Sequence, residues 1–121
     1  MARILVADDE TADRTLVDAV LRSAGYQVLS VVGGSSGIEA VRSRAFDLVI
    51  TDVAMPEGTG LELIREIRER SQDLPVIVIS GFAPEYLERA AELGADFVLS
   101  KPVDPDSLLD LVREALAKKP A

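Results

Sequence analysis

Residues 48–52 read Leu-Val-Ile-Thr-Asp, a short apolar run that ends in a carboxylate. Consecutive aliphatic and β-branched residues without alternation are typical of a strand buried on both faces, as in a parallel sheet. The run predicts a strand over Leu48–Thr51 with Asp52 at its carboxyl end. Four other segments share this character and predict further strands: Ile4–Ala7, Val28–Val32, Val76–Ser80 and Phe97–Leu99.

Segments with helical spacing of apolar residues separate these runs. In the first of them, Leu16, Val20 and Ala24 share one face, and Gly25 ends the helix. The predicted helices are Thr11–Ala24, Ser36–Arg44, Leu61–Arg70, Pro84–Leu93 and Pro105–Lys118. Strict alternation of strands and helices predicts an α/β fold of the flavodoxin-like type: a doubly wound parallel sheet with helices on both faces and strand order 2-1-3-4-5.

The length of 121 residues suits a single domain over 1–121. We expect its core to cover about residues 3–117, with 118–121 as a tail or the start of a linker. No apolar run is long enough to span a bilayer and no signal peptide is evident, so we expect a cytoplasmic protein without a membrane partner. The net charge of −8 disfavours direct binding to nucleic acid, whose phosphates carry the same sign.

Histidine and cysteine are both absent from the chain. The lack of cysteine excludes disulfides and thiolate metal sites. The lack of histidine removes the commonest general base and the commonest transition-metal ligand. Any chemistry must therefore depend on carboxylates, lysine, hydroxyl groups and a hard cation.

Polar residues follow four of the five predicted strands. Asp8 and Asp9 come after the first strand, Asp52 after the third, Ser80 ends the fourth and Lys101 follows the fifth. Each alone has an ordinary interpretation as a helix cap, a turn residue or a surface charge. Ligands of open α/β sheets bind beyond the carboxyl ends of the strands, where these residues would meet. An oxygen-only cluster favours Mg²⁺, and a carboxylate beside Mg²⁺, a hydroxyl and a lysine can accept a phosphoryl group.

The order and spacing of these residues resemble the receiver domain of two-component response regulators, the CheY-like superfamily. The resemblance covers almost the whole chain, from Arg3 to about Leu116. It rests on several linked motifs: Asp8-Asp9, Asp52 followed by Val53-Ala54-Met55-Pro56 and Gly60, Ser80-Gly81, Gly94-Ala95-Asp96, and Lys101-Pro102. Each motif is weak alone, and their combination in this order is specific.

The resemblance implies a role for each matching position of the metal and acceptor site. Asp52 would be the phosphoacceptor. Asp9 would bind Mg²⁺ directly and Asp8 through water, and the backbone carbonyl of Ala54 would be a further ligand. The domain would assist its own phosphorylation and dephosphorylation without being an enzyme in the usual sense.

The resemblance also implies how the phosphoryl group is read out. Ser80 would donate a hydrogen bond to it, Lys101 would pair with one of its oxygens, and the Lys101–Pro102 peptide bond would be cis. Signalling, and a possible homodimer, would use the face made by the fourth helix, the fifth strand and the fifth helix.

Three positions depart from the family pattern. The family usually has an aromatic residue at the position of Val98, and Phe97 should face the opposite side of its strand. The two positions that tune hydrolysis are Ala54 and Phe82, neither of which can orient an attacking water. We therefore expect a comparatively long-lived phospho-Asp52.

The resemblance implies a phosphohistidine donor in trans, on a sensor histidine kinase or a histidine phosphotransfer protein. The signal would pass to a downstream protein or to an output domain outside these residues. Two alternatives remain open. One is a degenerate receiver that binds partners without phosphorylation. The other is a Mg²⁺-dependent phosphohydrolase, which is disfavoured because Ala54 occupies the place of its second acid and because the chain has no room for a cap domain.

Overall fold

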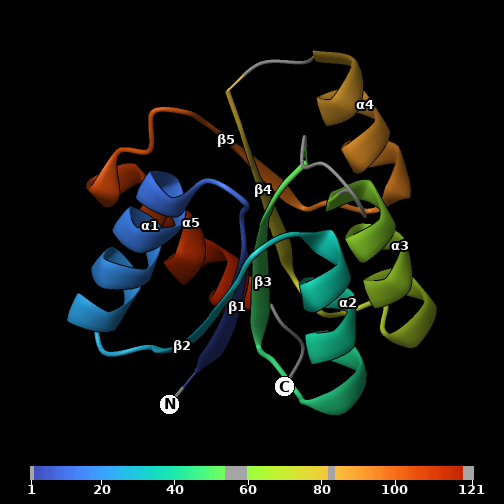
Figure 1. Ribbon diagram of the computed structural model, residues 1–121, viewed down its shortest axis with the longest axis horizontal. Coiled ribbons are helices and arrows are strands. Elements are labelled where there is room, and N and C mark those ends of the chain that lie inside the picture. The colour runs from blue at the N-terminus through green and yellow to red at the C-terminus, as the bar shows by residue number, and fades with distance from the viewer. Residues whose placement is uncertain (1, 54–59, 82–83, 119–121) are drawn as a thin grey trace.

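A parallel sheet forms the centre of the molecule, with helices on both of its faces (Figure 1). The computed structural model describes residues 2–53, 60–81 and 84–118. The sheet order is β2-β1-β3-β4-β5, which confirms the predicted topology. The strands are β1 (Arg3–Ala7), β2 (Gln27–Val31), β3 (Leu48–Asp52), β4 (Val76–Ser80) and β5 (Phe97–Ser100). The helices are α1 (Thr11–Ser23), α2 (Gly34–Ser43), α3 (Gly60–Arg70), α4 (Pro84–Leu93) and α5 (Pro105–Lys118).

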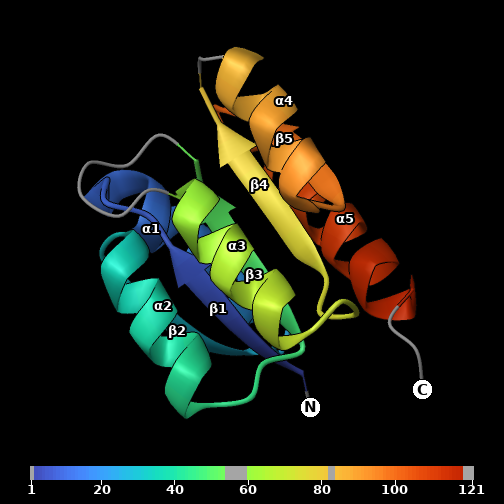
Figure 2. The same ribbon diagram turned by 90° about the vertical axis from the view of Figure 1, so that its right-hand side faces the viewer.

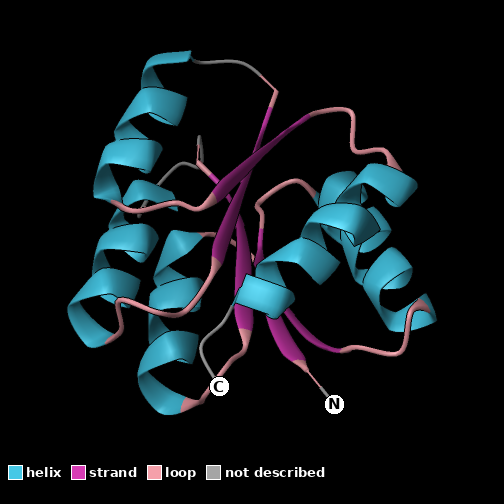
Figure 3. Cartoon of the chain, turned by 180° about the vertical axis from the view of Figure 1, so that it is seen from behind, coloured by secondary structure: helices cyan, strands magenta, loops and turns pink. Residues whose placement is uncertain are grey.

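Two apolar cores lie on the two faces of the sheet. Helices α1 and α5 cover one face, and α2, α3 and α4 cover the other (Figures 1 and 3). Alternate residues of one strand enter different cores: in β1, Ile4 and Val6 face α1 and α5, whereas Leu5 and Ala7 face the other three helices. Burial on both faces explains why β1, β3 and β4 are continuous apolar runs.

The predicted strand and helix ends agree with the structure to within one residue, except at α2. The sequence pattern predicts that this helix begins at Ser36, but it begins at Gly34. Gly33 has a φ of 91° and turns the chain directly from β2 into the helix. Gly37 then faces α3, where an added Cβ would lie 2.9 Å from Leu63 Cδ2, so the helices pack closely here (Figure 2).

The alternation of β1 and β3 places two carboxylates on the same side of the sheet. Ala7 pairs with Thr51, and the next residues along the two parallel strands are Asp8 and Asp52. These follow Val6 and Ile50 by two residues, so they continue the side that faces α1 and α5. The fold therefore brings two acidic side chains together at the carboxyl ends of neighbouring strands.

Among the described helices, none has the combination of length and apolar character needed to cross a membrane.

Arg68 connects three segments at the opposite end of the sheet. Its guanidinium donates to the carbonyl oxygens of Ser71, Leu74 and Gly94 at 2.7–3.2 Å, and to Asp96 Oδ2 at 3.0 Å. The same Asp96 oxygen accepts the Val76 N–H at 2.8 Å. The motif Gly94-Ala95-Asp96 therefore serves the fold, because it joins the loops before β4 and β5 through one half-buried arginine.

Replacement of Arg68 should destabilise the fold far more than replacement of an exposed arginine. We expect Arg68→Ala to lower the free energy of unfolding by about 2–4 kcal/mol, because it leaves several carbonyl groups without their donor. Arg113→Ala removes an exposed pair with Asp110 and should cost less than about 0.5 kcal/mol. Urea denaturation of both variants checks this, and equal losses would contradict the assigned role of Arg68.

Candidate functional site

The carboxyl ends of β1, β3 and β4 bury polar side chains. Asp8, Asp52 and Ser80 are 4%, 5% and 3% exposed. One carboxylate oxygen from each of Asp8, Asp9 and Asp52 lies within 4.8 Å of the others. Burial of charged groups this close together is unfavourable unless a partner of opposite charge is present. These three carboxylates therefore need positive charge close by.

Lys101 supplies that positive charge. Its Nζ donates to Asp52 Oδ2 at 2.7 Å and lies 3.5 Å from Asp8 Oδ2. The lysine follows β5, and its backbone N–H donates to the Ser80 carbonyl at 2.9 Å. The Lys101–Pro102 peptide bond is cis, as expected. We refer to Asp8, Asp9, Asp52 and Lys101 together as the acidic site.

Two further carboxylates, which the sequence analysis did not single out, also reach this lysine. Asp13 Oδ2 lies 2.9 Å from Lys101 Nζ, and Glu10 Oε1 lies 3.6 Å from it. Asp13 is in the first turn of α1, four residues after Asp9. Asp9 precedes the helix, so the sequence marks Asp13 only as an acidic residue in a first helical turn, where a negative charge is ordinarily favourable.

The charges around Lys101 explain the altered pKa values. Burial alone would lower the pKa of the Lys101 ammonium, but its hydrogen bonds to Asp52 and Asp13 and the charge of Asp8 outweigh burial and raise it. Burial raises the pKa of Asp8, against the lowering effects of the Glu10 N–H and of Lys101. The charges of Asp52 and Asp13 raise the Asp8 pKa further. Lys101 is therefore a fixed cation, whereas ionised Asp8 is held at a cost.

The donor set fits a small, hard dication. Four carboxylates, those of Asp8, Glu10, Asp13 and Asp52, lie within 3.6 Å of the Lys101 ammonium, and Asp9 lies beside two of them. The Arg14 guanidinium adds a second positive charge at the Asp8 carbonyl. A negative excess therefore remains. Mg²⁺ prefers oxygen ligands at about 2.0–2.1 Å, so opposite ligands are about 4 Å apart. The three aspartate oxygens all lie within 4.8 Å of one another and form the candidate ligand cluster.

The backbone of Asp52 is fixed from two directions. The buried Thr51 hydroxyl donates to the Asp52 carbonyl at 2.9 Å. Gly60, the first residue of α3, packs so closely that an added Cβ would overlap the same carbonyl oxygen. Only glycine fits there, which gives a physical reason for Gly60 in the motif that follows Asp52.

The other residues expected at the site are Ala54, Phe82 and Val98. Ala54 and Phe82 lie outside the described residues. Val98 is 44% exposed on β5, the edge strand next to β4, whereas Phe97 packs into the core beneath α1 and α5. Phe97 therefore faces away from the side that Val98 occupies, as the strand alternation predicts.

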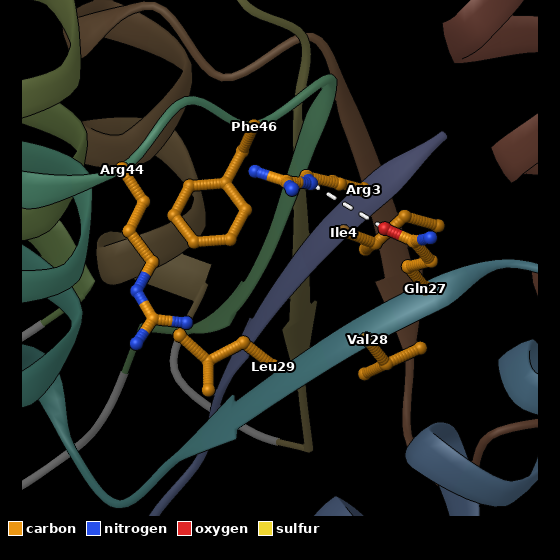
Figure 4. A pocket seen from close by; sticks show the side chains of 7 residues that line it. All are labelled: Arg3, Ile4, Gln27, Val28, Leu29, Arg44 and Phe46. Atoms are coloured by element: carbon orange, nitrogen blue, oxygen red, sulfur yellow. Dashed lines mark hydrogen bonds between the residues drawn. The ribbon is translucent and has the colours of Figure 1, made fainter. Parts of the chain in front are cut away.

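A hollow of about 430 Å³ lies at the other end of the sheet (Figure 4). It is lined by the amino ends of β1 and β2 and by residues that precede β3: Arg3, Ile4, Gln27, Val28, Leu29, Arg44 and Phe46. None of the acidic-site residues lines it. The chemistry that the carboxylates and Lys101 support is therefore separate from this hollow.

Comparison with known proteins agrees with this geometry. Among curated proteins, the chain is 37% identical over 115 residues to the transcriptional regulatory protein ZraR of Escherichia coli O157:H7. The match covers 94% of this chain and 26% of ZraR, so the chain spans about a quarter of that relative. It is 34% identical over 119 residues to the two-component response regulator ORR3 of Oryza sativa subsp. indica, covering 95% of this chain and 91% of that protein.

Solved structures show the same fold. A CheY-like response regulator receiver domain protein from Methanospirillum hungatei JF-1 superposes with a TM-score of 0.93 at 28% identity, covering 98% of this chain and 96% of that one. Chemotaxis response regulator CheY4 of Vibrio cholerae gives a TM-score of 0.87 at 30% identity, with 95% and 98% covered. The family model of the response regulator receiver domain matches residues 4–113. This chain therefore belongs to the response regulator receiver domain family.

Proposed function

We propose that this chain is the phosphoryl-accepting switch of a two-component phosphorelay and that Asp52 is the acceptor. The observation that supports this most strongly is the 2.7 Å contact between the buried Asp52 carboxylate and the Lys101 ammonium, beside Asp8 and Asp9. Since the chain contains no histidine, the phosphohistidine donor belongs to another protein, a sensor histidine kinase or a histidine phosphotransfer protein.

The transfer needs only positioned charge and a nucleophile. An Asp52 oxygen attacks phosphorus, the bond between phosphorus and the donor imidazole nitrogen breaks, and that nitrogen keeps the electron pair. The Lys101 ammonium then pairs with a phosphoryl oxygen, and the Ser80 hydroxyl donates to another. Both groups compensate the charge that the phosphoryl group brings into a buried site.

Asp8, Asp9 and Asp52 would hold Mg²⁺, together with the backbone carbonyl of Ala54, which lies outside the described residues. The ion, when bound, neutralises charge on the transferring phosphoryl oxygens. The fit of the three carboxylates supports this assignment. Without such an ion, Lys101 and Arg14 do not balance the carboxylates around them.

The output would pass to a downstream protein or to an output domain of a longer protein in the cytoplasm. The face made by α4, β5 and α5 is the proposed docking and homodimer surface, and Val98 is exposed on it. Because Val98 has no ring to follow Ser80, the response would depend on α4 and the segment that precedes it. Two-state switching of this kind requires that the two states bind the phosphoryl group differently.

Incubation with Mg²⁺ and acetyl phosphate tests the assignment of Asp52. We expect intact-mass spectrometry to show the gain of one phosphoryl group in the parent protein and none in Asp52→Asn. No gain in the parent, with Mg²⁺ binding verified by calorimetry, would favour a degenerate receiver. Continuous release of phosphate from many small phosphomonoesters would favour a phosphohydrolase.

Phospho-Asp52 should be comparatively long-lived, because neither Ala54 nor Phe82 has a polar side chain that can orient an attacking water. After removal of the donor, we expect the phosphorylated mass to decay several-fold more slowly in the parent than in a variant with Ala54→Asn and Phe82→Asn. The exposed substitution Asp110→Asn serves as the control and should not change the decay. A parent that decays as fast as the double variant would contradict this prediction.

The ionised Asp8 carboxylate should lower the stability of the metal-free protein and contribute to the binding of Mg²⁺. Its raised pKa means that the folded protein holds this proton more tightly than the unfolded chain does. The stabilisation is therefore complete below the unfolded pKa and is lost as pH rises through the raised folded pKa. At neutral pH without Mg²⁺, Asp8→Asn should raise the Tm, and the difference should shrink as the pH falls.

Added Mg²⁺ should then raise the Tm of the parent more than that of Asp8→Asn, because binding to the folded state alone is stabilising. The exposed Asp110→Asn removes the same charge far from the site and should keep the Mg²⁺ response of the parent. Thermal unfolding followed by circular dichroism gives both values. An Asp8→Asn variant less stable than the parent in metal-free buffer would contradict the assigned cost of this charge.

A further inference from the structure

Asp13 is the second carboxylate bound to Lys101, and its contact is nearly as short as that of Asp52. The distances from Lys101 Nζ are 2.7 Å to Asp52 and 2.9 Å to Asp13. Asp8 and Glu10 follow at 3.5 and 3.6 Å. An ammonium has three N–H donors, so Asp52 and Asp13 take the two short contacts.

Asp13 reaches Lys101 from helix α1, whereas Asp8 and Asp52 reach it from the ends of strands. Asp13 lies in the first turn of α1, where the positive end of the helix favours a negative charge. Its side chain is 25% exposed, against 5% for Asp52 and Asp8. Asp13 is therefore on the solvent side of Lys101, while Asp52 is on the buried side. The ammonium is held between the acceptor and α1.

A phosphoryl group on Asp52 needs the same ammonium. Its oxygens bring about −1.5 to −2 charges. Lys101 is a cation that already contacts the acceptor carboxylate directly. Every donor that Lys101 gives to Asp13 is one that the phosphoryl group does not receive. The Asp13 carboxylate also repels the incoming charge across a partly buried site, where screening by water is reduced.

We propose that Asp13 is a positioning residue that competes with the phosphoryl group for the Lys101 ammonium. The inference rests on the proposed function of Asp52 as the acceptor. In the unphosphorylated protein, Asp13 holds the lysine next to Asp52 and satisfies its charge. On phosphorylation, Lys101 turns from Asp13 to the phosphoryl oxygens. Asp13 thus stabilises the resting state and weakens phosphoryl binding.

Binding of beryllofluoride, an analogue of the phosphoryl group, tests this competition without turnover. We would measure its affinity by isothermal titration calorimetry for the parent, Asp13→Asn, Asp13→Glu and Glu10→Gln. A preceding titration with Mg²⁺ alone sets a saturating concentration for each protein. Glu10→Gln is the matched control, because it removes the same charge from a residue that is farther from Lys101 and 65% exposed.

We expect Asp13→Asn to bind beryllofluoride about fivefold more tightly than the parent, because the competing charge is gone. Asp13→Glu keeps the charge and should have the parent affinity, and Glu10→Gln should change it by less than about twofold. Equal affinity of Asp13→Asn and the parent, or weaker binding by the variant, would overturn the competition. A parent that binds no beryllofluoride would overturn the proposed function, and the inference with it.

Discussion

The contact between Lys101 and Asp52 is the interaction on which the proposed activity depends. It places the ammonium of one loop against a carboxylate at the end of a different strand, 49 residues earlier in the chain. The carboxylates of Asp8, Asp9 and Asp52 repel one another at this distance, which makes their grouping costly. The lysine offsets part of that cost, and a dication would offset the rest. The proposed acceptor chemistry thus requires that the loop carrying Lys101 stay next to the carboxyl end of β3, where Asp52 lies.

The sheet provides this adjacency. The register of β1 with β3 brings Asp8 beside Asp52, and the pairing of β4 with β5 brings Lys101 to the same edge through its bond to the Ser80 carbonyl. The two apolar cores and the Arg68 contacts at the opposite end fix the strand positions. Burial raises the pKa of Asp8, so ionised Asp8 is held there at a cost in stability.

Much of this could be predicted from local patterns. Apolar runs located the strands, and polar residues after them located Asp8, Asp52 and Lys101, because parallel strands share one carboxyl edge. The apolar pattern does not indicate the start of α2, because Gly33 makes the turn in a single residue of positive φ. The pattern of one segment does not reveal which distant group a side chain meets.

Asp13 and Arg68 illustrate that limit. Asp13 was interpretable only as an acidic residue in the first turn of a helix, until the loop after β5 placed Lys101 beside it. Arg68 was one of several arginines on a helix, and its carbonyl partner Gly94 is 26 residues away. Long-range contacts of this kind decide the electrostatics of the acidic site and the closure of the fold.

The most direct test is a crystal structure of the protein with Mg²⁺ and beryllofluoride. We expect beryllofluoride attached to Asp52, the cation bound directly by Asp9 and Asp52 and through water by Asp8, and Lys101 Nζ in contact with a fluorine atom. Beryllofluoride bound away from Asp52, or a Lys101 side chain that makes no contact with it, would contradict the account.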